Sequence, residues 1–293
     1  MAVVKHKDIN TEKMRCYSSI FSSTSFNNLF IKDDYSFITN KVMRYDLDNL
    51  GIKFTSYLDY LKYIYRELQK HYRCEYIYKN SIINELLLKK YGTKETVVFN
   101  EFKVGKSVAD TVLFNGTSKA FEIKTELDST KRLDGQLFHY TKIFKECYIV
   151  THEDLINKYI STDESIGIIA FKSFQGALKL TEIRPAIINQ KIDADVLIRS
   201  IRTSEYKNIV KTYYGTLPEM NSFDMFDKCY NLLCAIPDET LHQLFINQLK
   251  KRRNNTKELI SFPKELRQLC LSMNLSSLKY NELENKLNIP IKI

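Results

Sequence analysis

The sequence predicts an α/β fold in which a β-sheet is flanked by helices, with further helical segments before and after it. Two strand-like stretches, 108–114 and 118–124, flank the turn-forming residues 115–117, which is typical of a β-hairpin. A helical pattern precedes this hairpin at 80–92 and another follows it at 128–144. Short apolar runs typical of strands continue to about residue 184, and beyond about 192 the pattern is helical throughout.

Residues 1–75 read as a mainly helical extension. Ser56 and Asp59 have the spacing of a capping box ahead of a run of apolar residues at helical intervals. The polar stretch 16–28 predicts a loop or a weakly ordered arm. We therefore expect three consecutive parts: the extension 1–75, a core at 76–190 and a helical region at 191–293.

The core begins with a helix over 80–92. Its apolar residues Ile82, Ile83, Leu86 and Leu87 form one buried stripe, and Gly92 marks the end of the helix. A strand is predicted for 96–104.

The hairpin that follows groups three charged residues. A three-residue loop at 115–117 pairs Phe114 with Ser118 and therefore Asp110 with Glu122. Side chains alternate along a strand, so Glu122 and Lys124 share one face. A two-residue loop would instead separate the two carboxylates, so this grouping requires the longer loop or a bulge.

The chemistry of this grouping points to a metal site. Adjacent carboxylates repel unless a cation lies between them, and hard oxygen ligands suit Mg²⁺, with Mn²⁺ as a substitute. Lys124, two residues beyond the ligand Glu122, could orient a water or stabilise charge on a phosphoryl oxygen. We expect phosphodiester hydrolysis.

Over roughly 80–186 the chain resembles the PD-(D/E)XK nuclease superfamily, which implies a restriction-endonuclease-like mixed sheet flanked by helices. The superfamily carries an Asp and then a Glu-x-Lys on the next strand. Four Glu-x-Lys triplets occur here, beginning at Glu101, Glu122, Glu205 and Glu284. Asp195 lies at a suitable distance before Glu205, but that segment looks helical, so only the triplet at Glu122 has the strand context.

The segment after Lys124 is similar to the family's basic helix that bears a Gln. Helical spacing predicts a buried stripe with Asp128 or Ser129 as the N-cap, and the stripe comprises Leu133, Leu137, Tyr140 and Phe144. The resemblance implies that Gln136 orients the site and that Lys131 or Arg132 contacts phosphate. An ordinary solvated helix face is the alternative for these charges.

The resemblance implies two further contributions to the metal site. The carbonyl of Ile123 is a plausible additional ligand beside Asp110 and Glu122. Glu85, on the first helix of the core, would reach the metal or its waters, with an ordinary surface glutamate as the alternative. Glu101 is a weaker candidate for that role.

After the hairpin and its helix, the pattern predicts a helix at 155–160 and strands at 166–171 and 178–184. A helix at 238–252 ends in the basic run Lys250, Lys251, Arg252 and Arg253, and shorter helices follow at 263–273 and 278–287. The order loosely resembles a helix-turn-helix, but a plain helical bundle is favoured. The basic run is either a phosphate clamp or a solvated face.

Composition agrees with a nucleic-acid partner. The chain has 293 residues and a net charge of +9, and its isoelectric point is near 9.0, which favours polyanions. Six cysteines without Cys-x-x-Cys pairs indicate unpaired thiols in a reducing cytoplasm. No apolar run reaches the ~20 residues of a membrane helix, and no glycine-rich phosphate loop is present.

The sequence thus predicts a metal-dependent nuclease, an enzyme with DNA favoured over RNA, in a setting such as restriction, phage defence, recombination or repair. The alternative is a catalytically inactive DNA-binding or assembly module on the same fold. A homodimer or a partner protein is compatible with either function.

Overall fold

A computed structural model describes residues 2–174, 177–219, 221, 223–252 and 254–293. The chain groups into two compact units. The first unit contains Met1–Lys89, Ser173–Lys179 and Lys257–Ile293, and the second contains Lys90–Lys172 and Leu180–Thr256. The three consecutive parts expected from the sequence are therefore redistributed. Residues 257–293 belong to the same unit as the beginning of the chain, and residues 191–256 belong to the unit that contains the sheet.

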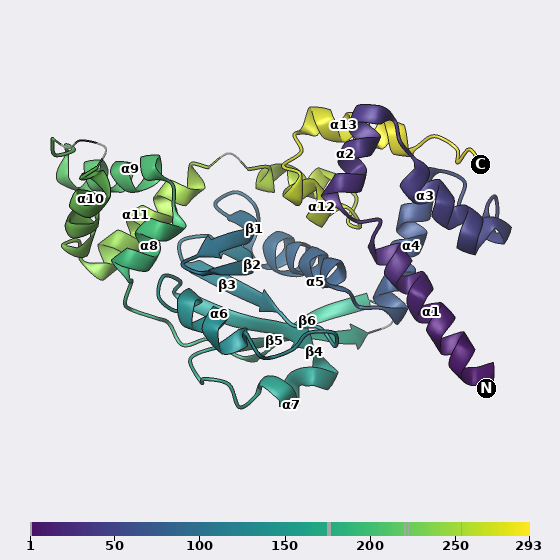
Figure 1. Ribbon diagram of the computed structural model, residues 1–293, viewed down its shortest axis with the longest axis horizontal. Coiled ribbons are helices and arrows are strands. Elements are labelled where there is room, and N and C mark those ends of the chain that lie inside the picture. The colour runs from purple at the N-terminus through teal and green to yellow at the C-terminus, as the bar shows by residue number, and fades with distance from the viewer. Residues whose placement is uncertain (1, 175–176, 220, 222, 253) are drawn as a thin grey trace. The chain divides into compact units, whose positions relative to one another are not determined.

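The second unit is built on a six-stranded sheet with the strands in sequence order (Figure 1). The strands are β1 (Val97–Val104), β2 (Ser107–Phe114), β3 (Ser118–Ile123), β4 (Glu146–His152), β5 (Gly167–Phe174) and β6 (Ala177–Arg184). β1, β2 and β3 pair antiparallel, whereas β3, β4 and β5 pair parallel. The fold is therefore α/β with a mixed sheet, as the sequence predicts.

A helix that follows the hairpin packs on the face of the sheet on which the main core lies. α6 (Leu133–Tyr140) crosses this face (Figure 1) and buries Leu137 and Tyr140 in a cluster with Val112, Phe114 and Ala120 of the hairpin. Phe144, at the end of the predicted stripe, is also buried there. The connection from β4 to β5 contains the short helices η4 (Glu153–Leu155) and α7 (Ile156–Tyr159).

Four helices follow the sheet in the second unit, and the helical pattern predicted beyond about residue 192 agrees with them. They are α8 (Ala194–Ser200), α9 (Thr203–Tyr214), α10 (Met225–Cys234) and α11 (Asp238–Lys250). α9 packs on both α10 and α11, and the four lie together in Figure 1. Glu205 lies in the first turn of α9, so its Glu-x-Lys triplet is helical, as predicted. On a helix, Glu205 and Lys207 point in different directions and do not share one face.

A buried histidine joins α11 to the sheet. His242 is 2% exposed, and its Nε2 lies 2.7 Å from Ser118 Oγ at the start of β3. Ser118 Oγ also accepts the backbone N–H of Lys145 at 3.0 Å, which leaves its own proton for Nε2. Among the described residues His242 Nδ1 has no hydrogen-bond partner. The site therefore suits a neutral imidazole.

This histidine should make the fold sensitive to acid. Burial, reinforced by the charge of Lys145, lowers the pKa of His242 from 6.5 to about 4. The unfolded chain then binds the proton more readily, so stability is lost as pH falls from about 6.5 towards 4, by about 2 kcal/mol at pH 5. Urea unfolding at pH 7.5 and pH 5 measures this loss. His242→Gln should reduce it, whereas His71→Gln, at the exposed end of α4, should not.

The first unit is mainly helical. Its helices are α1 (Ala2–Ser18), α2 (Ser23–Lys32), α3 (Ser36–Lys41), η1 (Val42–Asp46), η2 (Leu47–Asn49), α4 (Tyr57–His71), α5 (Glu75–Ser81), η3 (Ile82–Tyr91), η5 (Thr256–Ser261), α12 (Arg267–Ser272) and α13 (Ser277–Leu287), of which η3 and η5 extend slightly past its limits. The predicted capping box of α4 is confirmed, since Ser56 and Asp59 bond reciprocally. α5 and η3 together form the helix predicted before the first strand.

The loop or weakly ordered arm predicted for 16–28 is wrong. Most of this stretch is helical, in α1 and α2, with only a short link between them. Ser22 caps α2 by accepting the N–H of Ser25 at 3.2 Å, and Tyr17, Phe26 and Leu29 are fully buried. Polar residues here serve as caps, and tertiary packing of a few apolar side chains overrides the weak helix propensity of the rest.

A buried amide explains why the end of the chain belongs to the first unit. Asn80 in α5 is 0% exposed. Its Nδ2 donates to the backbone oxygen of Lys264 at 2.6 Å and to the hydroxyl of Tyr65 at 2.8 Å, and its Oδ1 accepts the N–H of Gln268 at 2.8 Å. One side chain thus bonds α4 and the segment around α12 to α5.

Gly167 at the start of β5 allows a close contact that no other residue would permit. A Cβ added there would lie 2.4 Å from the ring of Tyr148 and 2.8 Å from the backbone nitrogen of Ala186. Gly167→Ala should therefore lower the free energy of unfolding by about 1–3 kcal/mol. Gly135→Ala is the control, because Gly135 is exposed in α6 with no atom near its Cβ position, and it should stabilise by up to ~1 kcal/mol. Equal midpoints of urea unfolding in the two variants would contradict this.

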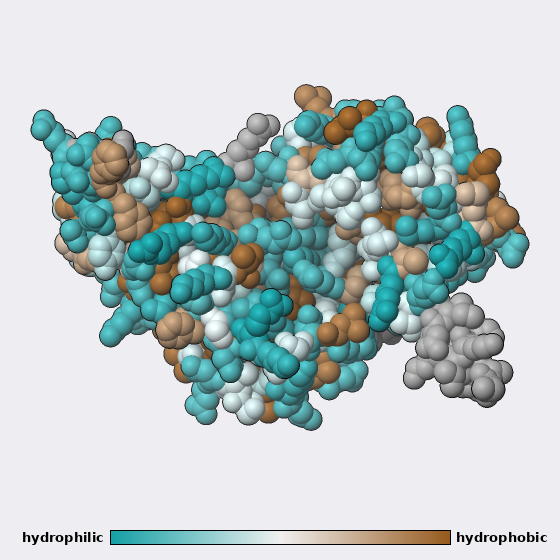
Figure 2. All heavy atoms as spheres, viewed as in Figure 1, coloured by the Kyte–Doolittle hydropathy of each residue, from teal (hydrophilic) through white to brown (hydrophobic). Residues whose placement is uncertain are grey.

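Within the described ranges, no helix is both long and apolar enough to cross a membrane. The face in Figure 2 is largely hydrophilic, with hydrophobic side chains scattered over it. All six cysteines are free thiols.

Candidate active site

The hairpin of β2 and β3 has the register that the sequence predicts. Phe114 pairs with Ser118 across a three-residue loop, and the antiparallel pairing continues in step along both strands. Extending it by one residue sets Asp110 opposite Glu122. The Oδ2 atom of Asp110 accepts the backbone N–H of Ile123 at 2.7 Å. The Asp110 side chain therefore lies directly against the strand that carries Glu122.

Glu122 and Lys124 form the buried centre of the site. Glu122 is 2% exposed and Lys124 is 7% exposed. Lys124 Nζ donates to Glu122 Oε1 at 2.9 Å and to Gln136 Oε1 of α6 at 3.2 Å. Three of the predicted catalytic residues are thus joined by direct hydrogen bonds. Their burial gives the charges a low-dielectric setting, in which electrostatic interactions are stronger than in water.

Tyr140 completes this centre, and the sequence placed it only in the buried stripe of α6. Its hydroxyl lies 2.7 Å from Glu122 Oε2 and 2.7 Å from the backbone oxygen of Val108. Burial, then the charge of Glu122, then that of Asp110, raise the pKa of Tyr140 well above its usual value of 10.0. The phenol therefore stays neutral and can donate its proton. Both carboxylates lie within electrostatic reach of this one hydroxyl.

A signal for Tyr140 is present in the sequence. Tyr140 follows Gln136 by four residues, so the two side chains stack on the same face of α6. A tyrosine in an otherwise apolar stripe needs a hydrogen-bond partner when it is buried. The spacing from Gln136 and the need for a hydrogen-bond partner together indicate that Tyr140 bonds to one of the two carboxylates.

The turn before α6 differs from the prediction. Neither Asp128 nor Ser129 caps the helix, which begins at Leu133 with Arg132 at the N-cap position. Asp128 instead accepts both the backbone N–H and the hydroxyl of Thr125 at 2.7 Å. The carboxylate therefore closes a turn just after Lys124, and this local hydrogen bonding competes with an earlier start of the helix.

The oxygen donors at this site fit a small hard cation. Among the described residues no three His, Cys, Asp or Glu side chains gather as a metal cage. Mg²⁺ does not require one, because it commonly binds through one or two carboxylates and keeps several waters. Lys124 and Tyr140 each use one oxygen of Glu122, and a carboxylate offers about four lone-pair positions. Glu122 therefore retains capacity to hold an ion, and Asp110 and the Ile123 carbonyl stay predicted ligands.

Of the two weaker carboxylate candidates, Glu101 lies nearer in register. Asn100 pairs with Thr111 and Phe102 pairs with Ala109, so Glu101 between them falls opposite Asp110. Glu101 has φ of +54°, a left-handed conformation that is uncommon for residues other than glycine and that clusters at functional sites. Glu85 belongs to the first unit and pairs with Lys89 at 2.6 Å on the same helix, so its role at the site stays a prediction.

Two predicted phosphate contacts lie on the surface beside the site. Lys131 and Arg132 are exposed in the turn that leads into α6, the helix that supplies Gln136 and Tyr140. Exposed lysine and arginine side chains are common partners of the nucleic-acid backbone. Their contact with phosphate stays a prediction.

The basic run after α11 divides into different environments. Lys251 is exposed, and Lys250 lies 3.7 Å from Glu95. Arg252 instead forms two hydrogen bonds to Glu205, at 2.6 and 2.7 Å. Arg253 lies outside the described residues.

Arg252 also has a structural role within this unit, and its predicted phosphate contact stays a prediction. Its guanidinium also lies over the rings of Phe99 and Phe102, at 5.6 and 5.3 Å from the ring centroids. The carboxylate of Glu205 in α9 binds the side of the guanidinium formed by Nε and Nη2. This arginine holds α9 and β1 against the end of α11.

Comparisons with known proteins place the chain in a family. The profile of the family described as "Bacteriophage P4 protein cII" matches residues 68–279. Protein cII of Enterobacteria phage P4 is 27% identical over 178 residues, which cover 59% of this chain and 65% of the relative. A Silicibacter pomeroyi protein of unknown function matches 49% of this chain and 94% of its own length, with 11% identity and a TM-score of 0.32, too distant to support an argument. Because the family profile spans well over half of its residues, the chain belongs to the bacteriophage P4 protein cII family.

Proposed function

We propose that the chain is a metal-dependent nuclease of the PD-(D/E)XK type, with DNA rather than RNA as its substrate. The observation that carries this proposal is the bonded group formed by Glu122, Lys124 and Gln136, with Asp110 on the neighbouring strand. The mixed sheet and the order of its strands and helices are those expected of that superfamily.

Asp110 and Glu122 would hold the ion. Bound Mg²⁺, or Mn²⁺ in its place, supplies Lewis acidity at the scissile phosphate. The N–H of Ile123 orients Asp110 through its Oδ2 atom, and the hydroxyl of Tyr140 orients Glu122 through its Oε2 atom. Each carboxylate is thus positioned by a donor from the protein before any ligand arrives, which is the preorganisation that catalysis needs.

Lys124 would act on the reacting groups. An ammonium group has three donors, and two of them are directed at Glu122 and Gln136. The third is available to orient the attacking water or to stabilise negative charge on a phosphoryl oxygen in the transition state. Gln136 serves as a positioning residue, because its carbonyl oxygen sets the direction of the Lys124 side chain.

The substrate track would be electrostatic. A net charge of +9 favours binding to a polyanion, and Lys131 and Arg132 are exposed cations on the turn before α6. We place the activity in the cytoplasm. Association as a homodimer or with a partner protein would suit cleavage of both strands.

A cleavage assay tests the proposal. The full chain is incubated with linear, circular, single-stranded and branched DNA and with RNA, in Mg²⁺, in Mn²⁺, in Ca²⁺ and in EDTA. Cleavage of DNA in Mg²⁺ or Mn²⁺ and its loss in EDTA are expected. Binding of DNA without cleavage of any substrate in either metal would reject the enzyme and leave an inactive DNA-binding module.

A further inference from the structure

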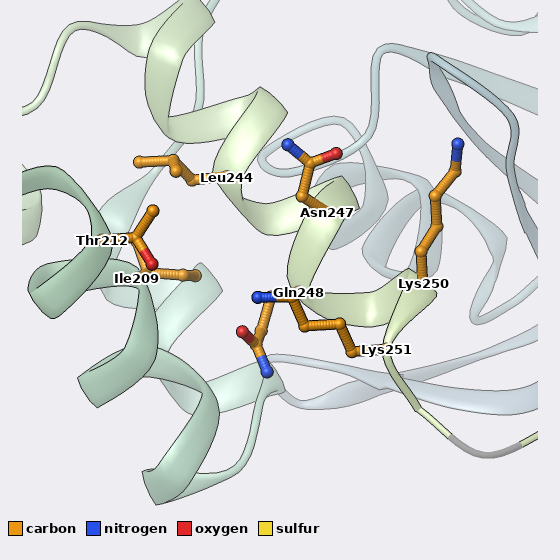
Figure 3. Close-up of a pocket in the computed structure, with 7 residues that line it drawn as sticks. All are labelled: Ile209, Thr212, Leu244, Asn247, Gln248, Lys250 and Lys251. Carbon is orange, nitrogen blue, oxygen red and sulfur yellow. The ribbon is translucent and has the colours of Figure 1, made fainter.

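A pocket lies between two helices of the second unit, and it shares no residue with the carboxylate site. It has a volume of about 370 Å³ and opens between α9 and α11 (Figure 3). Such a volume falls within the usual range for small-molecule sites. Ile209 of α9 and Leu244 of α11 supply its apolar part.

The polar residues of the pocket have unused hydrogen-bonding groups. Thr212, Asn247 and Gln248 line it. Gln248 is only 8% exposed, and within the described part of the chain its side-chain amide bonds to no other residue. The amide atoms of Gln248 are not among the fully buried polar atoms that lack a partner, so water can bond to them until an occupant of the pocket replaces it. Its amide offers both donors and an acceptor to an occupant.

The pocket also carries positive charge. Lys251 is exposed, and no ion pair to it occurs among the described residues. Figure 3 shows the Lys251 side chain running back along α11 towards Gln248, whereas the end of Lys250 points away from the pocket. Lys250 is also partly neutralised by Glu95, 3.7 Å away. Lys251 is therefore the cation available to an anionic ligand in the pocket.

We propose that this pocket binds a nucleotide, with its base between Ile209 and Leu244 and its phosphate at Lys251. Glutamine and asparagine amides match the paired donor and acceptor groups of base edges, apolar side chains favour the face of a base, and lysine favours phosphate. The nucleotide can be free or a unit of a strand. This proposal concerns binding and stands whether or not the chain cleaves DNA.

Titration of the full chain without divalent metal tests the proposal separately from cleavage. The probes for calorimetry are the four deoxynucleoside monophosphates, inorganic phosphate and a single-stranded oligodeoxynucleotide. Gln248→Leu should weaken binding of the preferred monophosphate about tenfold, since its base loses its polar partner. Lys251→Ala should weaken all phosphate-bearing probes and make the salt slope for the single strand shallower by ~0.7. Lys279→Ala, an exposed lysine of α13, is the control and should bind as the parent does.

The outcomes divide clearly. Competition between the oligonucleotide and a monophosphate identifies a strand unit as the occupant, and monophosphate binding without competition identifies a free nucleotide. The proposal would be overturned if inorganic phosphate bound as tightly as the nucleotides and Gln248→Leu left both affinities unchanged. The pocket would then be a simple anion site. So would the absence of any effect from both variants. Circular dichroism shows whether Gln248→Leu folds. If it does not, Lys251→Ala still tests the proposal, because truncation of an exposed side chain should leave the fold intact.

Discussion

Replacing Lys124 with alanine should lower the rate of DNA cleavage by roughly 10²–10⁴, because it removes the only donor we assign to the transition-state phosphate. Asp110→Asn and Glu122→Gln should abolish detectable cleavage. Both changes keep the shape of the side chain and remove the charge that would hold the metal. Single-turnover rates in Mg²⁺ measure the effect on chemistry, and DNA affinity in Ca²⁺ should fall little.

Stability has to be followed in the same variants. Glu122 and Lys124 are buried as a pair, and removing one partner leaves the other charge uncompensated, at a cost of about 3–5 kcal/mol. Circular dichroism and urea unfolding separate this loss from a loss of chemistry. Lys103→Ala is the matched control, since Lys103 ends another Glu-x-Lys triplet but is exposed on β1. Parallel losses of DNA binding and cleavage would identify the cluster as a structural ion pair only.

Asp46→Ala should destabilise the first unit by about 3–5 kcal/mol. The Asp46 side chain is 0% exposed and lies 3.0 Å from Lys13 Nζ. It accepts hydrogen bonds from the hydroxyls of Tyr17, Tyr60 and Tyr63, the second at 2.8 Å and the third at 3.4 Å. Alanine at this position would leave three buried hydroxyls and an ammonium without their common acceptor. The midpoint of urea unfolding measures the loss.

Asp48→Ala is the matched control for that change. Asp48 lies two residues further along the chain, but it is exposed, so the same truncation should change the free energy of unfolding by less than ~0.5 kcal/mol. Asp46→Asn should fall between the two, because an amide oxygen still accepts hydrogen bonds from the tyrosines. Similar midpoints for Asp46→Ala and Asp48→Ala would show that the tyrosine cluster contributes little to stability.

Local signals were sufficient for the hairpin, and they allowed two registers that differ in the length of the loop. The structure has the three-residue loop 115–117, which pairs Phe114 with Ser118. Alternation along the strand then sets Glu122 and Lys124 on one face. The short apolar run before Phe171 was also recognisable as a buried strand, because its composition and length are typical of one.

Long-range contacts were not accessible in the same way. The basic run 250–253 looked uniform, yet Arg252 pairs with Glu205, a residue 47 positions away. The polar stretch 16–28 looked like a loop, yet Phe26 and Leu29 anchor it as a helix. In both cases the deciding partner is distant in sequence, and its identity depends on how the chain closes around a core.

The sequence by itself determined that Asp110, Glu122 and Lys124 belong to one hairpin, because strand alternation and turn-forming residues are local signals. Only the tertiary structure decided what surrounds them. α6 could have presented Gln136 and Tyr140 to solvent or to the sheet. Leu133 and Leu137 are buried in the core on the sheet. This packing brings the amide of Gln136 to Lys124 and the phenol of Tyr140 to Glu122. Helix periodicity defines which residues share a face, and the packing of that face determines what they contact.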